Sequence, residues 1–255
     1  MPTDTPPPSA CAARSTPVGI ADLPTADDAL AALYAWPAGR LPVVRANMIA
    51  SLDGGTTVDG RSAGLGNRAD EALFALLRDL ADVILVGSGT VRAEKYGGVR
   101  LSERRQERRR RWGRPVEPPP IAVVTGRGLD PRSPLFTDTE TPPIVITTRD
   151  GAATVPAGVR VIVAGTDSID LHAAVTALAE EGFGRIHCEG GPSLLASLVG
   201  ADLLDECCLT LAPLLLGSRA TRMLPVALAD PAHWELVAAR LDGDHLFTRY
   251  RRAAQ

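Results

Sequence analysis

Short apolar runs and stretches of helical spacing alternate along most of the chain. Apolar runs bounded by turn residues predict buried strands, and amphipathic spacing predicts helices. Leu73, Leu76, Leu77 and Leu80 recur at helical spacing, and Asn67 stands where it would cap that helix. The predicted strands cover residues 41–50, 83–86, 121–125, 144–148, 159–164, 185–188, 206–212, 234–241 and 245–251, and the main helices residues 26–36, 69–80, 171–181 and 193–199.

The order of these elements predicts the fold class. Up to residue 199 strands and helices alternate, which favours parallel β-α-β units, whereas the last three strands follow without a long helix. We therefore expect an α/β fold with a mostly parallel central sheet and an antiparallel C-terminal edge. The proline-rich residues 1–24 are expected to be a disordered tail, and residues 25–255 a single domain.

Composition narrows the classes of function. A net charge of −3 gives no electrostatic argument for nucleic acid, and no apolar run is long enough to span a membrane. The start lacks the basic and apolar regions of a signal peptide, so we expect a cytoplasmic protein. The four cysteines have neither disulfide nor zinc-site spacing. His187 and Glu189 match the H-x-E half of a zinc deaminase, but the chain contains no P-C-x-x-C, so no metal is expected.

Candidate chemistry begins where the strand 185–188 ends. Glu189, Gly190 and Gly191 follow it, and Pro192 stands at the expected first position of a helix, where its missing N–H costs little. Free amides and the helix dipole there would bind an anion, and a strand-end carboxylate would face a ligand. The alternative is a tight turn with a solvated glutamate.

Two further strand ends carry turns of the same kind. Gly87-Ser88-Gly89-Thr90 follows the strand 83–86, although the third glycine of the dinucleotide fingerprint is missing. Ser51-Leu52-Asp53-Gly54 follows the first strand. Asp53 is either a turn former or a carboxylate in a cleft.

Together, residues 51–54, 87–91, 189–192 and 212–217 resemble, in order and rough spacing, the reductase domain of the bifunctional riboflavin-biosynthesis deaminase–reductase. The resemblance covers about residues 40–251 and is nearest to stand-alone actinobacterial-type pyrimidine reductases, some of which are associated with reducing dihydrofolate. It implies a three-layer α/β/α dihydrofolate-reductase-like fold, NADPH as hydride donor, and a homodimer joined along strands 206–212 and 245–251.

The resemblance also implies roles for particular residues. Glu189 and Asp53 would be catalytic and face the substrate ring. Arg127 would pair with an adenosine 2′-phosphate or be a surface arginine. Arg78 would hold a substrate anion or pair with Asp82. The remaining implied contacts are Ser62 and Arg100 to the substrate, and Ala50, Gly87, Gly89, Thr90, Glu94, Thr125, Gly190, Gly191, Pro192 and Ser193 to the cofactor.

Two questions stay open at this point. The substrate is either a phosphoribosylamino-pyrimidine, such as 5-amino-6-(5-phosphoribosylamino)uracil, or the pterin of dihydrofolate. A nucleotide-binding protein without turnover is the alternative from another class, although strand-end carboxylates favour the enzyme. The arginine-rich residues 101–120 favour a solvated loop or helix face over a phosphate site.

Overall fold

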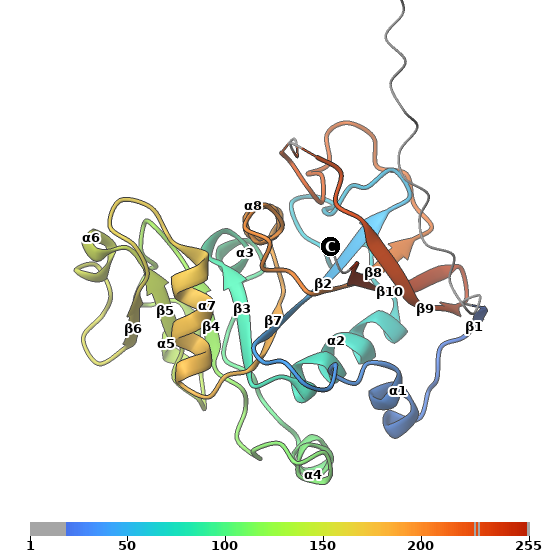
Figure 1. The fold of residues 1–255 in the computed structure, drawn as a ribbon, viewed down its shortest axis with the longest axis horizontal. Coiled ribbons are helices and arrows are strands. Elements are labelled where there is room, and N and C mark those ends of the chain that lie inside the picture. Colours follow the sequence, from blue (N-terminus) through green and yellow to red (C-terminus); the bar gives the residue numbers. More distant parts are fainter. Residues whose placement is uncertain (1–18, 227, 229, 254–255) are drawn as a thin grey trace, which may run out of the picture.

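The computed structural model describes residues 19–226, 228 and 230–253. Within them one sheet runs in the order β1-β9-β10-β8-β2-β7-β3-β4-β5-β6, which Figure 1 shows across the molecule. The strands are β1 (Ile20–Asp22), β2 (Val43–Ser51), β3 (Val83–Gly87), β4 (Ile121–Val124), β5 (Ile144–Thr147), β6 (Arg160–Val163), β7 (Arg185–Cys188), β8 (Glu206–Ala212), β9 (Trp234–Asp242) and β10 (His245–Arg252). The helices are α1 (Asp27–Leu33), α2 (Arg68–Leu80), α3 (Ser88–Ala93), α4 (Glu103–Arg111), α5 (Pro134–Thr137), α6 (Arg149–Ala152), α7 (Leu171–Glu180) and α8 (Pro192–Gly200).

The sheet is parallel from β8 to β6, and β10 lies antiparallel between β8 and β9. The prediction of a mostly parallel sheet with an antiparallel C-terminal edge is confirmed. The expected tail needs correction, because Ile20–Asp22 form β1 and pair with β9 at the outer edge. Residues 1–18 of that tail lie outside the described residues.

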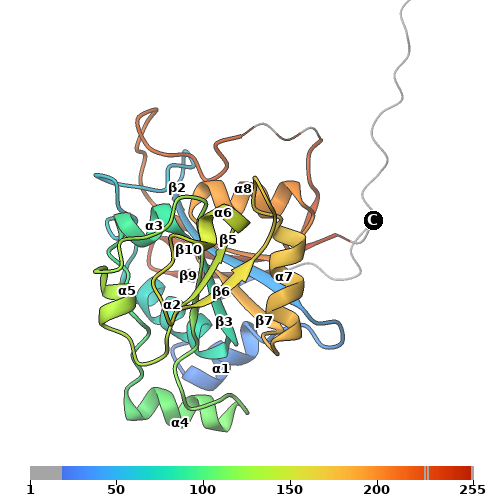
Figure 2. The same cartoon turned by 90° about the vertical axis from the view of Figure 1, so that its left-hand side faces the viewer.

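Helices cover both faces of the sheet, because consecutive strand residues point to opposite sides. Val83 and Leu85 pack with α7 and α8, whereas Ile84 and Val86 pack with α3 and α5. On that second side α1 and α2 cover the part of the sheet that carries Cys208. Figure 2 shows α7 and α8 on one side of the sheet and α2, α3 and α5 on the other. The three-layer expectation is therefore confirmed.

Local signals placed the longer helices well. The Asn67 side chain accepts a hydrogen bond from the Asp70 amide at 2.9 Å, so the predicted cap of α2 is confirmed. α7 ends shortly before Gly182, whose φ of +90° suits glycine. The helices α5 and α6 are missing from the prediction, because four residues each are too few to show a helical period.

The arginine-rich stretch corrects the sequence interpretation. It contains α4, and Arg108 and Arg109 are buried. Arg105 and Arg108 pair with the fully buried carboxylate of Asp79, and Arg109 Nη1 donates to the Asp79 carbonyl oxygen at 2.7 Å. The prediction of a solvated helix face is therefore correct for the outer arginines of α4 and wrong for Arg105, Arg108 and Arg109. They fasten the C-terminal end of α2 instead.

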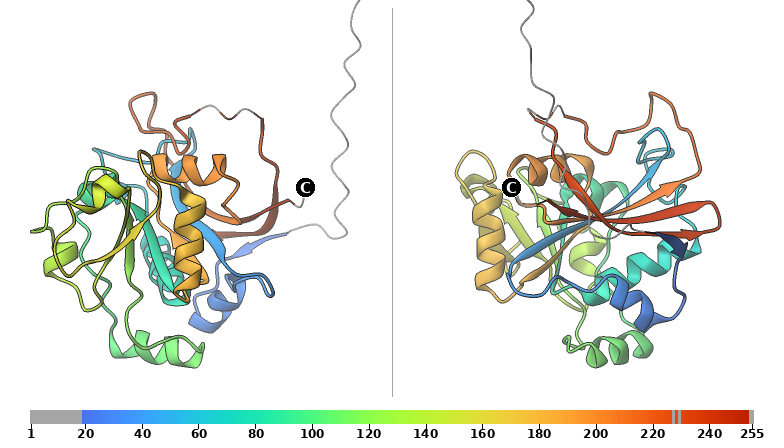
Figure 3. Two further views of the ribbon diagram at one scale, coloured as in Figure 1. Left: turned by 60° about the vertical axis from the view of Figure 1, so that its left-hand side comes forward. Right: turned by 45° about the vertical axis from the view of Figure 1, so that its right-hand side comes forward.

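Two loops meet above the carboxyl end of β2. The Leu52 amide donates to the Leu214 carbonyl at 2.9 Å, and the Thr56 amide to the Thr221 carbonyl at 2.8 Å. Figure 3 shows these loops, residues 52–67 and 213–226, side by side at the top of the molecule. This is the edge of the parallel sheet at which ligands of α/β folds bind.

Candidate active site

Two adjoining pockets lie where β2, β3, β4 and β7 end. The first, of about 660 Å³, is lined by residues 87–90, 167–169 and 191–194 among others. The second, of about 410 Å³, lies on the β2 and α2 side and includes Glu189. Both volumes are typical of small-molecule sites. The two pockets share a wall made of Thr57, Thr90, Glu94, Gly191 and Pro192.

The first pocket is built around the start of α8. Pro192 occupies the first turn of this helix, and Gly191 precedes it. A Cβ on Gly191 would lie 2.5 Å from Thr90 Oγ1, and Gly190 has φ +74°. Only glycine therefore lets the backbone lie this close to α3, and the helix amides face open space for an anion.

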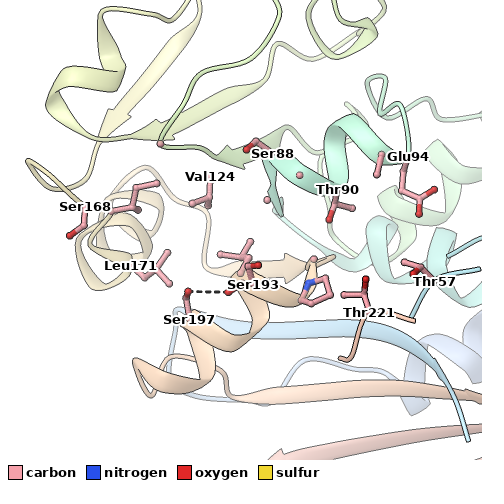
Figure 4. A pocket seen from close by; sticks show the side chains of 18 of the residues that line it. Thr57, Ser88, Thr90, Glu94, Val124, Ser168, Leu171, Ser193, Ser197 and Thr221 are labelled. Atoms are coloured by element: carbon pink, nitrogen blue, oxygen red, sulfur yellow. Dashed lines mark hydrogen bonds between the residues drawn. The ribbon is translucent and has the colours of Figure 1, made fainter. Parts of the chain in front are cut away.

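The other walls of the first pocket come from separate segments. Figure 4 shows Thr90 and Glu94 from the α3 region, Ser193 from α8, and Thr57 and Thr221 from the two loops around one space. Gly87 and Gly89 line it as well, so the structure brings together most of the residues expected at the cofactor. The glycine turns lie beside polar, largely uncharged side chains, which suits an extended phosphate-bearing ligand.

Glu189 is the central charge of the second pocket. Its side chain is 1% exposed, and Arg78 donates to both carboxylate oxygens, at 2.6 and 2.8 Å. The Tyr96 hydroxyl donates to Oε2 at 2.6 Å. Burial alone would raise the pKa of Glu189, but the Arg78 guanidinium lowers it below its ordinary value. Glu189 is therefore an ionised acceptor held by two donors.

His187 and Tyr96 complete the surroundings of this carboxylate. His187 is fully buried with Nε2 3.6 Å from Glu189 Oε1, and burial lowers its pKa to about 4. Burial, and next the charge of Glu189, raises the pKa of Tyr96 well above its ordinary value. His187 is therefore neutral and Tyr96 keeps its proton at neutral pH. Within residues 19–253, the described part shows no cluster of three or more His, Cys, Asp or Glu side chains suited to a metal ion.

Three of the expected substrate residues lie in or beside this pocket. Ser62 lines it and donates through its hydroxyl to Glu94 Oε1 at 3.0 Å. Arg78 also lines it and pairs with Glu189, not with Asp82. Arg100 does not line either pocket. It is exposed and pairs with Asp138 and Glu140, and its expected contact to the substrate stays a prediction.

Asp53 is held by its own loop. Its carboxylate accepts hydrogen bonds from the Ser51 hydroxyl at 2.5 Å and from the amides of Leu216 and Gly217, the latter at 2.6 Å. These bonds, that of Ser51 first, lower the pKa of Asp53 to about 2. It lines neither pocket and ties the two loops together, and its expected catalytic role stays a prediction.

The remaining expected cofactor residues lie at the margins. Ala50 is buried within β2, one residue beyond the lining residue Ile49. The Thr125 hydroxyl donates to the Gly128 carbonyl and so shapes the turn after β4. Arg127 is exposed on that turn. Gly190 lies between Glu189 and the lining residue Gly191.

Sequence reasoning missed several residues of the second pocket, among them Asn47, Asp70, Phe74 and Tyr96. Asp70, Phe74 and Arg78 follow one another at intervals of four on α2, so they share one face of the helix. This spacing was available in the sequence as a polar–aromatic–polar line beside the leucine stripe. Asn47 and Tyr96 carried no comparable signal.

A comparison with protein families decides the relationship. The family model for the RibD C-terminal domain matches residues 42–247. The chain belongs to the RibD C-terminal domain family. No helix among residues 19–226, 228 and 230–253 is long and apolar enough to cross a membrane.

Relatives of this family member have named activities. A 2,5-diamino-6-ribosylamino-4(3H)-pyrimidinone 5′-phosphate reductase of Archaeoglobus fulgidus is 30% identical over 184 residues, covering 70% of this chain and 83% of the relative. The enzyme of the same name from Methanothermobacter thermautotrophicus is 28% identical over 218 residues, covering 82% and 97%. A pyrimidine reductase-like protein of Corynebacterium diphtheriae superposes with a TM-score of 0.72 at 27% identity, covering 84% of this chain and 93% of that one.

Proposed function

We propose that the chain is a nicotinamide-dependent reductase that transfers a hydride to a phosphoribosylamino-pyrimidine in riboflavin biosynthesis. The observation that carries this proposal is the shared wall of the two pockets, Thr57, Thr90, Glu94, Gly191 and Pro192. A hydride transfer needs donor and acceptor in contact, and a shared wall allows that contact. The names of the two archaeal relatives support the pyrimidine substrate.

The first pocket fits the cofactor. The cradle that a Cβ on Gly191 would fill, and the amides at the start of α8, would hold the pyrophosphate. When bound, the dinucleotide supplies the hydride. The finer choice of NADPH over NADH rests on Arg127, which is exposed next to the lining residue Gly126 and can reach toward a 2′-phosphate. Equal dissociation constants for NADPH and NADH would contradict this choice.

The second pocket orients the acceptor. Glu189 stays ionised beside Arg78 and accepts hydrogen bonds from N–H or O–H groups of the substrate. Arg78 uses Nε and Nη2 for Glu189, which leaves its Nη1 directed to other partners. The shape of the pocket holds the acceptor carbon against the shared wall and excludes water there.

The decisive experiment follows NADPH oxidation with the purified substrate and with dihydrofolate in parallel. Glu189→Gln should lower kcat/KM by about 10²-fold while NADPH affinity stays unchanged, because Glu189 lines the second pocket and not the first. Glu235→Gln, on the exposed side of β9, is the matched control. Turnover of dihydrofolate alone, or an equal loss of cofactor affinity in Glu189→Gln, would contradict the proposal.

We further propose a homodimer, but with a contact surface other than the strand edges expected from the sequence. β8 and β10 are internal strands, so their edges are covered within the chain and cannot pair with a second copy. The half-buried face of β8 is apolar, and with Trp234, Tyr250 and α8 it lines a groove of about 340 Å³. Leu209→Glu should convert a dimer into a monomer in light scattering. A wild-type monomer at micromolar concentration would remove the proposal.

A further inference from the structure

The lining of the second pocket is rich in hydrogen-bond acceptors. Four acidic residues, Asp70, Glu71, Glu94 and Glu189, face a single cation, Arg78, which is already paired with Glu189. Glu94 is partly used as well, since it accepts from Ser62. The pocket therefore suits a ligand that presents several N–H donors.

Asn47 adds an independent observation. Its Oδ1 atom is buried and has no hydrogen-bond partner, and the residue lines the same pocket from β2. A buried acceptor without a donor is costly, so such atoms usually mark the place of a ligand or water. The acceptors of the pocket thus come from β2, from α2 and from the residues that directly follow α3 and β7.

Asp70 is a further acceptor that the fold holds in place. It lies in the first turn of α2 and is half-buried, whereas its neighbour Glu71 is exposed. The Gly66 backbone packs so closely that an added Cβ would lie 2.9 Å from Asp70 Oδ2. Burial raises the pKa of Asp70, while Thr210 and His245 act in the opposite direction. One helical turn further on, Phe74 offers an aromatic face to a flat ring.

We propose that Asp70 selects the substrate ring by accepting two hydrogen bonds from a 2-amino-4-pyrimidinone edge, namely from the ring N3–H and the exocyclic 2-amino group. This inference deepens the proposed function and rests on it. It places the reductase before the step that removes the 2-amino group. A deaminase acting on the reduced product would then have to follow.

The uracil ring cannot donate the second of these two hydrogen bonds to Asp70. Its edge presents an N3–H donor beside the O2 acceptor, and O2 would face a carboxylate oxygen. An unpaired, repulsive contact of this kind discriminates far more strongly than a lost methyl group. An asparagine would offer one acceptor and one donor, which matches the uracil edge.

The test compares kcat/KM for the ribosylamino-pyrimidine 5′-phosphate with a 2-amino group and for its uracil counterpart, with NADPH. Wild type should favour the 2-amino substrate by about 10²-fold or more. Asp70→Asn should reduce that preference at least tenfold, and it keeps the backbone amide that Asn67 caps. Glu235→Gln removes a charge on the exposed side of β9, outside both pockets, and should retain the wild-type ratio.

The outcomes separate the two proposals. If wild type reduces neither pyrimidine, the proposed function itself fails. If it reduces both equally or prefers uracil, the proposed function stands and the inference about Asp70 is overturned. An unchanged substrate ratio in Asp70→Asn also overturns it. Should Asp70→Asn fail to fold, Asp70→Ser replaces it, because it also removes the pair of acceptor oxygens and should reduce the same preference.

Discussion

The buried pair of Arg78 and Glu189 yields the sharpest prediction about stability. Arg78→Met keeps an unbranched side chain against Phe74, on whose ring the guanidinium lies at 4.4 Å, but removes the charge. Glu189 would remain 1% exposed with its two bonds from Arg78 lost and only Tyr96 as a donor. Stranding a buried charge costs about 3–5 kcal/mol. Glu189 can avoid the buried charge by taking up a proton. Protonating a carboxylate with an ordinary pKa of 4.5 costs about 3 kcal/mol at pH 7.

The pH dependence has a definite sign. In wild type the pKa of Glu189 lies below 4.5, so its contribution to stability is present above that value and lost as the pH falls through the folded-state pKa. In Arg78→Met burial acts without the opposing cation and raises the folded-state pKa above 4.5. The folded state of the variant then becomes less stable as the pH rises, because the unfolded state releases this proton more easily. The deficit of the variant should therefore grow by about 2–3 kcal/mol between pH 5 and pH 7.

Urea unfolding of both proteins between pH 5 and pH 8 measures this deficit. The double variant Arg78→Met/Glu189→Gln supplies the control, because it removes the stranded charge with the cation. It should recover at least half of the lost stability at pH 7 and remain inactive. A deficit that does not change with pH, or a double variant as unstable as Arg78→Met, would refute the reasoning.

Three further predictions concern other parts of the molecule. Gly191→Ala should weaken NADPH binding at least tenfold in a fluorescence titration, because its methyl group would collide with Thr90 Oγ1 at 2.5 Å. Asp79→Ala should lower the free energy of unfolding by about 3 kcal/mol in urea, because it leaves buried arginines of α4 unpaired. Asp53→Asn should speed tryptic cleavage after Arg219 at pH 7, because the bonds that lower its pKa to about 2 also fix that loop.

Each of these results has a control in the chain. Gly200→Ala adds a methyl group at the end of α8 with nothing within 4 Å, so NADPH affinity should stay unchanged. Glu103→Ala removes an exposed charge from the first turn of α4 and should leave the free energy of unfolding within about 0.5 kcal/mol of wild type. Asp59→Asn lies in the neighbouring loop and should leave tryptic cleavage unaltered. Equal effects in test and control variants would contradict the assigned contacts.

The fold could be predicted from local patterns because the longer elements carry their own signals. The strand 83–86 is a β-branched run, and α2 has both a leucine stripe and the Asn67 cap. β1 had no such signal: its three residues are exposed, and only pairing with β9 defines it. The arginines of α4 misled for a related reason. A charge run indicates solvent unless its partner is known, and Asp79 lies over twenty residues away in sequence.

Only the part of the site that is built from glycine turns could be predicted from the sequence. Glycine turns at strand ends identified the first pocket, because their positions follow from the parallel sheet. Asp53 and Arg100 carried the right charges but are satisfied by partners that become neighbours only in the fold, Gly217 and Asp138. A charged side chain in a sequence has no visible partner. Roles that depend on an unpaired charge therefore cannot be assigned before the tertiary contacts are known.

The two pockets differ in the polar groups that line them. The first places glycine amides and the start of α8 beside hydroxyl side chains, which favours an anionic ligand. The second has four carboxylates and one arginine in its lining, which favours a ring rich in N–H donors. We therefore expect the phosphate-bearing part of the dinucleotide at the start of α8 and the substrate ring beside Glu189, with the shared wall between them.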